Sequence, residues 1–134
     1  KSIQSMFKQH IKIEPSKISV SSLDDKLIKK ALDYTEANIS NPEFSVEELS
    51  RELGMSRVHL YKKLLSITGK TPIEFIRVIR LKRAAQLLEE SQLSVSEIAY
   101  EVGFNNPKYF RKYFKDEFDV LPSQYGNRKG AVDE

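Results

Sequence analysis

The sequence of 134 residues contains no cysteine and no apolar run that approaches the ~18–20 residues of a membrane-spanning helix. The absence of cysteine excludes a disulfide framework and a thiolate metal site, and it is compatible with a reducing cytoplasm. The N-terminus lacks the apolar core of a signal peptide. We therefore expect a cytoplasmic chain, whether or not its parent protein is anchored in a membrane. Because the chain begins without Met, we also expect it to be a fragment of a larger protein.

Positive charge is concentrated in the second part of the chain. Residues 1–55 carry 8 basic and 9 acidic side chains, whereas residues 56–129 carry 14 basic and 8 acidic ones. The second part therefore has an excess of +6, although the whole chain has a net charge of only +3. A localised positive field of this kind indicates a polyanionic partner more strongly than the total charge does.

An internal repeat is the strongest signal in the sequence. The segment SVEELSRELGM, which begins at Ser45, matches SVSEIAYEVGF, which begins at Ser94, with a constant offset of 49. Each segment opens with a serine that can cap a helix and a glutamate three residues later. Each contains a glycine near its end, Gly54 or Gly103, that can adopt the left-handed conformation of a tight turn. Followed by a second helix, each segment predicts a helix-turn-helix unit.

The second helix of each unit separates an apolar inner face from an outer one. Spaced for the inner face are Leu60, Leu64 and Ile67 in the first helix and Phe110, Phe114 and Phe118 in the second. The outer faces carry Val58, Tyr61, Lys62 and Leu65 in the first and Lys108, Arg111, Lys112 and Lys115 in the second. Four cations on one face repel one another unless a polyanion or solvent screens them. A solvated face without a partner is the alternative, but acidic side chains gather on the preceding helix in both units, so the charge is sorted rather than scattered.

A single long helix is predicted between the two units, over the stretch TPIEFIRVIRLKRAAQLLEES. Thr71 can cap this helix, Pro72 suits its first position, and Glu74 can complete a capping box. One apolar stripe contains Ile73, Ile76, Leu81, Ala84, Leu87 and Leu88. Further apolar residues surround the first half, which we expect to be enclosed. Arg77 and Arg80 lie inside the stripe, where snorkelling or pairing with neighbouring carboxylates is favoured over phosphate contact.

These motifs resemble the paired helix-turn-helix DNA-binding domain of AraC/XylS-type transcriptional regulators over residues 24–126. The resemblance rests on four segments: SRVHLYKKLL, the RxxRLxxAxxLL run, SVSEIAYEVGF, and YFRKYFK followed by Pro122 and Tyr125. The fold that it implies is all-α and homeodomain-like, with two helix-turn-helix subdomains joined by a long connecting helix. One departure is Asp119, which stands where many members have glycine. Asp tolerates a left-handed turn, so we expect a modest cost.

We expect the chain to have five parts. A linker or interface segment from a missing upstream domain is predicted at 1–22, and a disordered tail at 127–134. Between them lie a first helix-turn-helix subdomain at 23–71, the connecting helix at 72–90 and a second subdomain at 91–126. The stretch EPSKISVSSLDDKLIKKALDY also resembles the start of the C-terminal output domain of hybrid two-component response regulators. The apolar residues of the first segment lead us to expect that it pairs protomers.

The resemblance implies that the second helix of each subdomain enters the major groove, on successive turns of one face of the duplex. The base-facing candidates by motif position are Arg57, Val58, Tyr61 and Lys62 in the first unit and Asn106, Pro107, Lys108, Arg111 and Lys112 in the second. The phosphate candidates are Ser56, Lys63, Lys70, Thr71, Arg80, Asn105 and Lys115. The cations of the first set have the reach for guanine or for phosphate, and the sequence does not choose between them. Val58 and Pro107 have no side-chain donor, so they could contact a base only through apolar groups, such as a thymine methyl.

An enzyme and a helical protein-interaction module are the competing functions. The two histidines, His10 and His59, are far apart in the sequence, and neither an HExxH motif nor a glycine-rich phosphate loop is present. An interaction module would need exposed apolar grooves instead of a cationic face. We therefore expect a DNA-binding domain for transcription regulation, with no catalytic activity, cofactor, metal or membrane contact. The expected partners are double-stranded DNA, a second copy of the chain through residues 1–22 or an upstream domain, and RNA polymerase.

Overall fold

The structure is a computed structural model that describes residues 22–126 as α-helices and one short 3-10 helix, with no strand in that range. The elements are α2 (Ser22–Ala37), α3 (Val46–Glu52), α4 (Arg57–Thr68), α5 (Pro72–Glu90), α6 (Val95–Glu101), α7 (Pro107–Phe118) and η2 (Pro122–Gln124). The all-α prediction is confirmed. None of these helices combines the length and the apolar character needed to cross a membrane. The predicted interface segment, up to residue 21, and the predicted tail at 127–134 lie outside the described residues.

The chain folds as two compact units, which share the long helix α5. The first unit contains α2, α3, α4 and the beginning of α5, up to Arg77. The second unit contains the rest of α5, from Val78, together with α6, α7 and η2. The segment Asn38–Glu43, which forms most of the loop between α2 and α3, belongs to the second unit. The sequence pattern did not indicate this placement of the loop.

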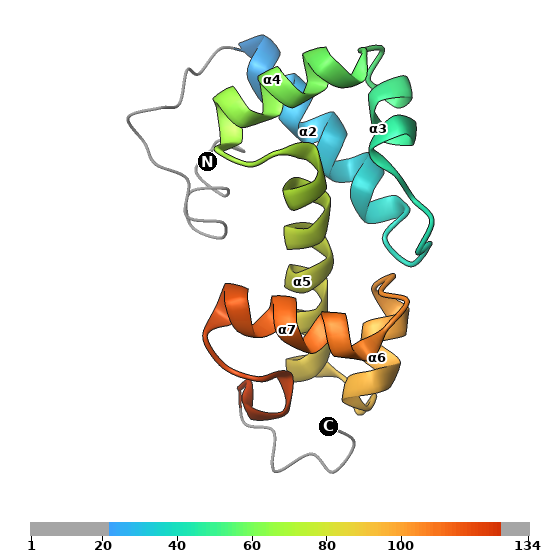
Figure 1. The fold of residues 1–134 in the computed structure, drawn as a ribbon, viewed down its shortest axis with the longest axis vertical. Coiled ribbons are helices and arrows are strands. Elements are labelled where there is room, and N and C mark those ends of the chain that lie inside the picture. The colour runs from blue at the N-terminus through green and yellow to red at the C-terminus, as the bar shows by residue number, and fades with distance from the viewer. Residues whose placement is uncertain (1–21, 127–134) are drawn as a thin grey trace. The chain divides into compact units, whose positions relative to one another are not determined.

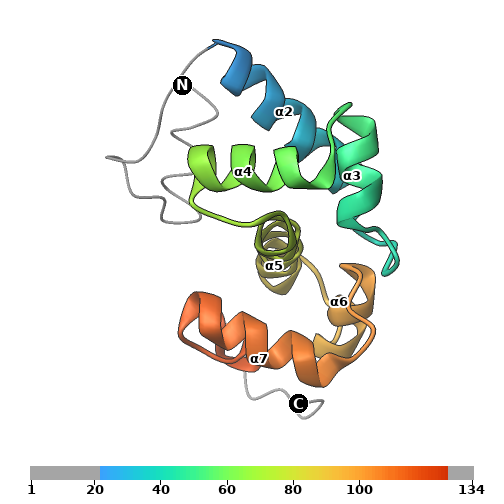
Figure 2. The same cartoon turned by 45° about the horizontal axis from the view of Figure 1, so that its top comes forward.

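In the first unit, α3 packs against both α2 and α4 (Figures 1 and 2). The buried apolar residues of this unit are Ile28, Ala31, Phe44, Leu49, Leu60, Leu64, Ile67, Phe75 and Ile76. The predicted inner face of α4 is therefore confirmed. Ser50, on α3, is also buried, as expected of a small residue at a place where another helix approaches closely.

In the second unit, α7 packs against α6 and η2 around a core that also includes α5 (Figure 1). The core residues are Leu81, Ala84, Ala85, Leu88, Val95, Ile98, Ala99, Val102, Phe110 and Phe114. Aromatic rings extend this core to the end of the described chain: Phe114 lies 4.5 Å from Phe118, and Tyr125 meets Phe114 edge-on at 5.4 Å between ring centroids. The predicted inner face of α7 is confirmed, with Phe118 only partly buried.

Short-range capping fixes where the helices begin. Ser45 caps α3 by accepting a hydrogen bond from a backbone N–H three residues later. Ser94 and Glu97 form a complete capping box at α6, since Glu97 also accepts from the Ser94 N–H at 2.8 Å. Thr71 and Glu74 make the same reciprocal pair at α5, at 2.9 and 3.3 Å. These starts were all predicted from the sequence.

The glycine turns have the predicted conformation, but the first helical turn of α5 differs from the prediction. Gly54 and Gly103 have φ values of 69° and 93°, which confirms the predicted left-handed turns. Ile73, which we placed in the apolar stripe, is 60% exposed, while Phe75 is fully buried. Because residues 73 and 75 are separated by about 200° around a helix, burying Phe75 turns Ile73 outward. The predicted enclosure of the first half of α5 therefore begins at Phe75.

Candidate nucleic-acid interface

Helices α4 and α7 correspond residue for residue at an offset of 50. Both have 12 residues, and each begins after a side-chain cap: Ser56 Oγ accepts a backbone hydrogen bond at 3.1 Å and Asn106 Oδ1 at 2.9 Å. Each ends at a left-handed residue, Gly69 or Asp119, whose N–H donates to the carbonyl oxygen four residues earlier. The helices therefore present equivalent positions to solvent.

The burial of the inner faces determines which positions lie outward. Leu60 and Leu64 of α4 have no exposed surface, and neither do Phe110 and Phe114, their equivalents on α7. Residues one or two positions away from these lie on other sides of the helix, because successive residues are rotated by about 100° around its axis. The outward pairs, α4 first, are Val58 and Lys108, Tyr61 and Arg111, Lys62 and Lys112, and Leu65 and Lys115.

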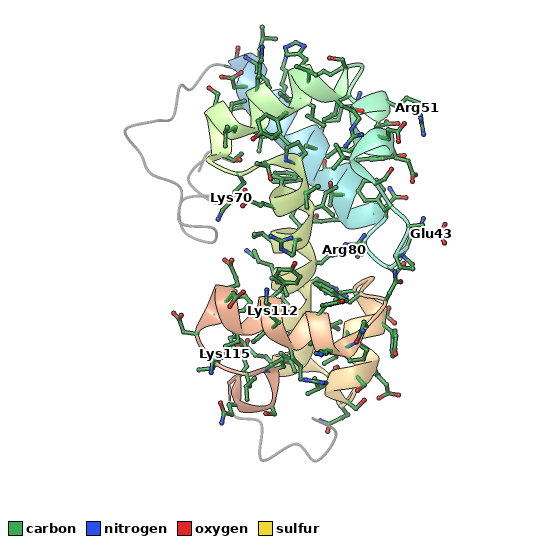
Figure 3. The ribbon with its side chains drawn as sticks, in the orientation of Figure 1. Glu43, Arg51, Lys70, Arg80, Lys112 and Lys115 are labelled. Carbon is green, nitrogen blue, oxygen red and sulfur yellow. The ribbon has the colours of Figure 1, made fainter. Side chains whose placement is uncertain are left out.

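The outer face of α7 is cationic. Lys108, Lys112 and Lys115 are exposed, and Arg111 is partly exposed. Lys112 Nζ lies 4.9 Å from the centre of the Tyr113 ring, its neighbour along the chain (Figure 3). Within residues 22–126, none of the three lysines pairs with an acidic side chain. Their charges are therefore available to an external anion.

The outer face of α4 carries fewer charges and more apolar surface. Arg57 and Lys62 are exposed, as predicted. Val58 is 65% exposed, Tyr61 48% and Leu65 41%. Leu65 was not among the predicted site residues. The repeat contained the signal that could have found it, since the offset of 50 matches Leu65 to Lys115, which was predicted.

The remaining base-facing and phosphate candidates lie around the helix starts. Asn105 and Asn106 are exposed, and Pro107, the first residue of α7, is half-buried. Ser56 is also exposed, but its hydroxyl already accepts the capping hydrogen bond. The hydroxyl of Thr71 is used in the same way. At these helix starts, backbone N–H groups rather than free hydroxyls are what a phosphate could meet.

Two predicted lysines differ in their surroundings. Lys63 is half-buried, and its Nζ lies 3.2 Å from Asp24 Oδ1 on α2. Because Asp24 is itself buried, Lys63 neutralises a buried carboxylate. This ion pair would have to break before Lys63 could contact a phosphate. Lys70 is also half-buried, in the turn before α5. Its backbone N–H donates to the Thr68 hydroxyl.

Arg80 requires a correction, because the structure gives it neither of the predicted roles. Only 7% of its surface is exposed, and its guanidinium donates to the carbonyl oxygens of Ile39, Asn41 and Val102 (Figure 3). Burial lowers the pKa of Arg80 from its ordinary value, but an arginine remains charged at neutral pH. The guanidinium thus joins the loop at 38–43 to the second unit, and we exclude Arg80 from the interface.

A metal centre finds no support in the described part of the chain. Within residues 22–126 there is no group of three or more His, Cys, Asp or Glu side chains that could hold a metal ion. His59 is exposed on α4, and its backbone N–H donates to the hydroxyl of Ser56, the N-cap of that helix. His10, the other histidine, lies outside the described residues.

Two short helix pairs, each with a glycine turn and an exposed second helix, define a helix-turn-helix DNA-binding protein. A family model described as a helix-turn-helix domain matches residues 49–128. The chain belongs to this family, as an AraC-type DNA-binding domain of a transcriptional regulator. The resemblance stated from the sequence motifs is confirmed.

The proteins similar to this chain include transcriptional regulators and a protein named as a histidine kinase. Histidine kinase P4 of Formosa agariphila is 52% identical over 116 residues, which are 87% of this chain but only 8% of that protein. The C-terminal domain of AraT, a response regulator from Geobacillus stearothermophilus, has a TM-score of 0.67 and 30% identity, covering 74% of this chain and 82% of that one. The DNA-binding domain of AdpA, in complex with a target DNA, has a TM-score of 0.65 and 30% identity, covering 78% and 90%.

Proposed function

We propose that α4 and α7 are the two recognition helices of this domain and that each places its outer face in a major groove of the DNA. The base-facing residues of this proposal are Arg57, Val58, Tyr61 and Lys62 on α4 and Asn106, Pro107, Lys108, Arg111 and Lys112 at α7. The observation that carries it is the exposed cationic face of α7 at the same helical positions as the exposed face of α4. The AdpA domain, which is similar in fold, has been solved with a target DNA, and this supports the proposal.

We assign the phosphate contacts to the ends of these helices. Lys115 is exposed one turn beyond the base-facing part of α7, and Lys70 follows the C-terminus of α4. The N-terminal amides near Ser56 and Asn105 can donate to phosphate oxygens. Thr71 contributes through the start of α5, whereas Lys63 is a weaker candidate because of its pairing with Asp24.

The parent protein, we propose, is a hybrid two-component regulator of which this chain is the output domain. The chain matches a small part of a protein named as a histidine kinase and also resembles the C-terminal domain of a response regulator. Sensing and phosphorylation would then belong to other parts of the parent protein. Residues 1–22 would transmit the signal by pairing protomers, and RNA polymerase is the proposed target of the bound domain.

Selection of duplexes from a random pool tests the proposal. The chain should enrich two short motifs separated by about one helical turn, ~10 base pairs, if both helices read DNA. Binding should also weaken steeply as salt increases, because lysine and arginine contacts to phosphates release counterions. Enrichment of no motif, or an affinity that does not change with salt, would contradict the function proposed for these helices.

A further inference from the structure

We infer that α4 reads thymine methyl groups through an apolar strip, Val58, Tyr61 and Leu65, whereas α7 binds its half of the site chiefly through charge. This inference rests on the proposed function and names the chemistry that each helix recognises. It predicts a DNA site with two unlike halves. Thymine methyls are required in the half that α4 contacts, and the other half is recognised by cations.

The strip is continuous and faces outward. Its residues follow the spacing i, i+3 and i+7, which places them along one side of a helix. Their exposed fractions are 65%, 48% and 41%, although Leu60 and Leu64, between them in the sequence, are fully buried. At 1.5 Å per residue the strip is about 10 Å long, which matches the rise of about three base pairs.

The equivalent positions of α7 show that the apolar character is particular to α4. At the offset of 50, Lys108 replaces Val58, and Lys115 replaces Leu65. The two helices share their length, their capped ends and two fully buried positions on the inner face. The fold therefore does not require valine, tyrosine or leucine at the outer positions of α4. We therefore attribute the apolar side chains at these positions to contact with a binding partner.

The surroundings of the strip favour DNA over a protein as its partner. Arg57 and Lys62 are exposed on the same helix and border the strip with positive charge. In the major groove, the C5-methyl of thymine is the apolar group on the base edges, and phosphates border the groove. An apolar strip flanked by cations is complementary to that arrangement. Tyr61 also carries a hydroxyl, which can donate to a base or a phosphate at the end of an apolar ring.

Replacing thymine with deoxyuridine tests this inference, because it removes only the methyl group and keeps every hydrogen-bonding group of the base. The chain first selects its duplex from a random pool. All thymines of one half of that duplex are then replaced, one half at a time, and Kd is measured by fluorescence anisotropy. The expected result is a loss in one half only, about fourfold for each contacted methyl, since that is the effect of exposing one buried methyl group to water.

Two matched variants assign the effect to a helix. Val58→Ala should reduce the loss caused by deoxyuridine, because the side chain that contacts the methyl is shortened. Lys108→Ala, at the equivalent position of α7, should bind more weakly but keep the full loss. Both positions are exposed, so folding of each variant is checked by circular dichroism against the unaltered chain.

The outcomes separate this inference from the proposed function. Equal affinity for thymine and deoxyuridine duplexes, with sequence preference retained, overturns the inference and leaves the proposed function intact. A selected site without thymine in either half overturns it as well. If Val58→Ala retains the affinity, the preference and the deoxyuridine effect, Val58 does not contact the thymine methyl, which also overturns the inference. Equal binding to all duplexes overturns the proposed function itself.

Discussion

Replacing Arg80 with alanine should destabilise the domain far more than replacing any exposed arginine. The guanidinium is buried and donates to three backbone carbonyl oxygens, at 2.8 Å to Val102, 3.1 Å to Asn41 and also to Ile39. A charged hydrogen bond contributes about 1.5–3 kcal/mol, but three bonds that share one group do not add fully. We expect a loss of about 3–5 kcal/mol in the free energy of unfolding, the cost of removing one partner of a buried charged network.

Urea unfolding followed by circular dichroism measures this loss. Arg83 is the matched control, since it lies on the same helix, is exposed and, within residues 22–126, donates a side-chain hydrogen bond to Gln86 alone, at 3.1 Å. Arg83→Ala should change stability by no more than about 0.5 kcal/mol. Arg80→Lys should recover only a small part of the loss, because an ammonium group lacks the planar fork that reaches several acceptors.

Gly103 provides an independent check of the same contact. A Cβ at Gly103 would overlap both Arg80 Nη1 and the Ile39 carbonyl oxygen, and the φ of 93° is itself unfavourable for alanine. Gly103→Ala should therefore be costly, but less so when Arg80 is already alanine, with a coupling of about 1–3 kcal/mol. A cost for Arg80→Ala below about 1 kcal/mol, or a Gly103→Ala cost that is the same in both backgrounds, would refute the reasoning.

Three further results are expected. A hydrogen bond from the Thr71 backbone N–H holds the pKa of Glu74 below its ordinary value. The ionised Glu74 therefore stabilises the fold at pH values above the pKa of an unfolded glutamate, ~4.3, and this stabilisation is lost as the pH falls through the folded pKa. The difference in urea midpoint between the unaltered chain and Glu74→Gln should therefore disappear at acidic pH, and an unchanged difference would count against this. Asp119 has a φ of 67°, which glycine adopts more readily than residues with a Cβ. Asp119→Gly should therefore raise the free energy of unfolding by up to about 1 kcal/mol, and Asp119→Ala should lower it. Equal effects of the two substitutions would argue against backbone strain at this position. Lys115→Ala should reduce the slope of log K against log salt by about 0.9, the value for one lost phosphate contact, and an unchanged slope would remove Lys115 from the interface.

The sequence alone determined the helices, their caps and their turns, because the interactions that fix them join residues close together in the chain. Ser94 with Glu97 and Thr71 with Glu74 are capping pairs three residues apart, and such pairs can be read as a pattern. The glycine turns and the buried faces of α4 and α7 follow from equally local spacing. The repeat also indicated which faces lie outward, and hence most of the candidate interface.

Only the tertiary structure decided what the buried polar groups do. The partners of Arg80 are 22 to 41 residues away in the sequence, and they are backbone carbonyls, which every residue possesses. No residue pattern can mark such acceptors, so the sequence suggested carboxylates or phosphates instead. The pairing of Lys63 with Asp24 escaped prediction for the same reason, since it depends on how α2 packs in the first unit. Local periodicity thus specified each helix, whereas contacts between distant segments determined which charges remain available to DNA.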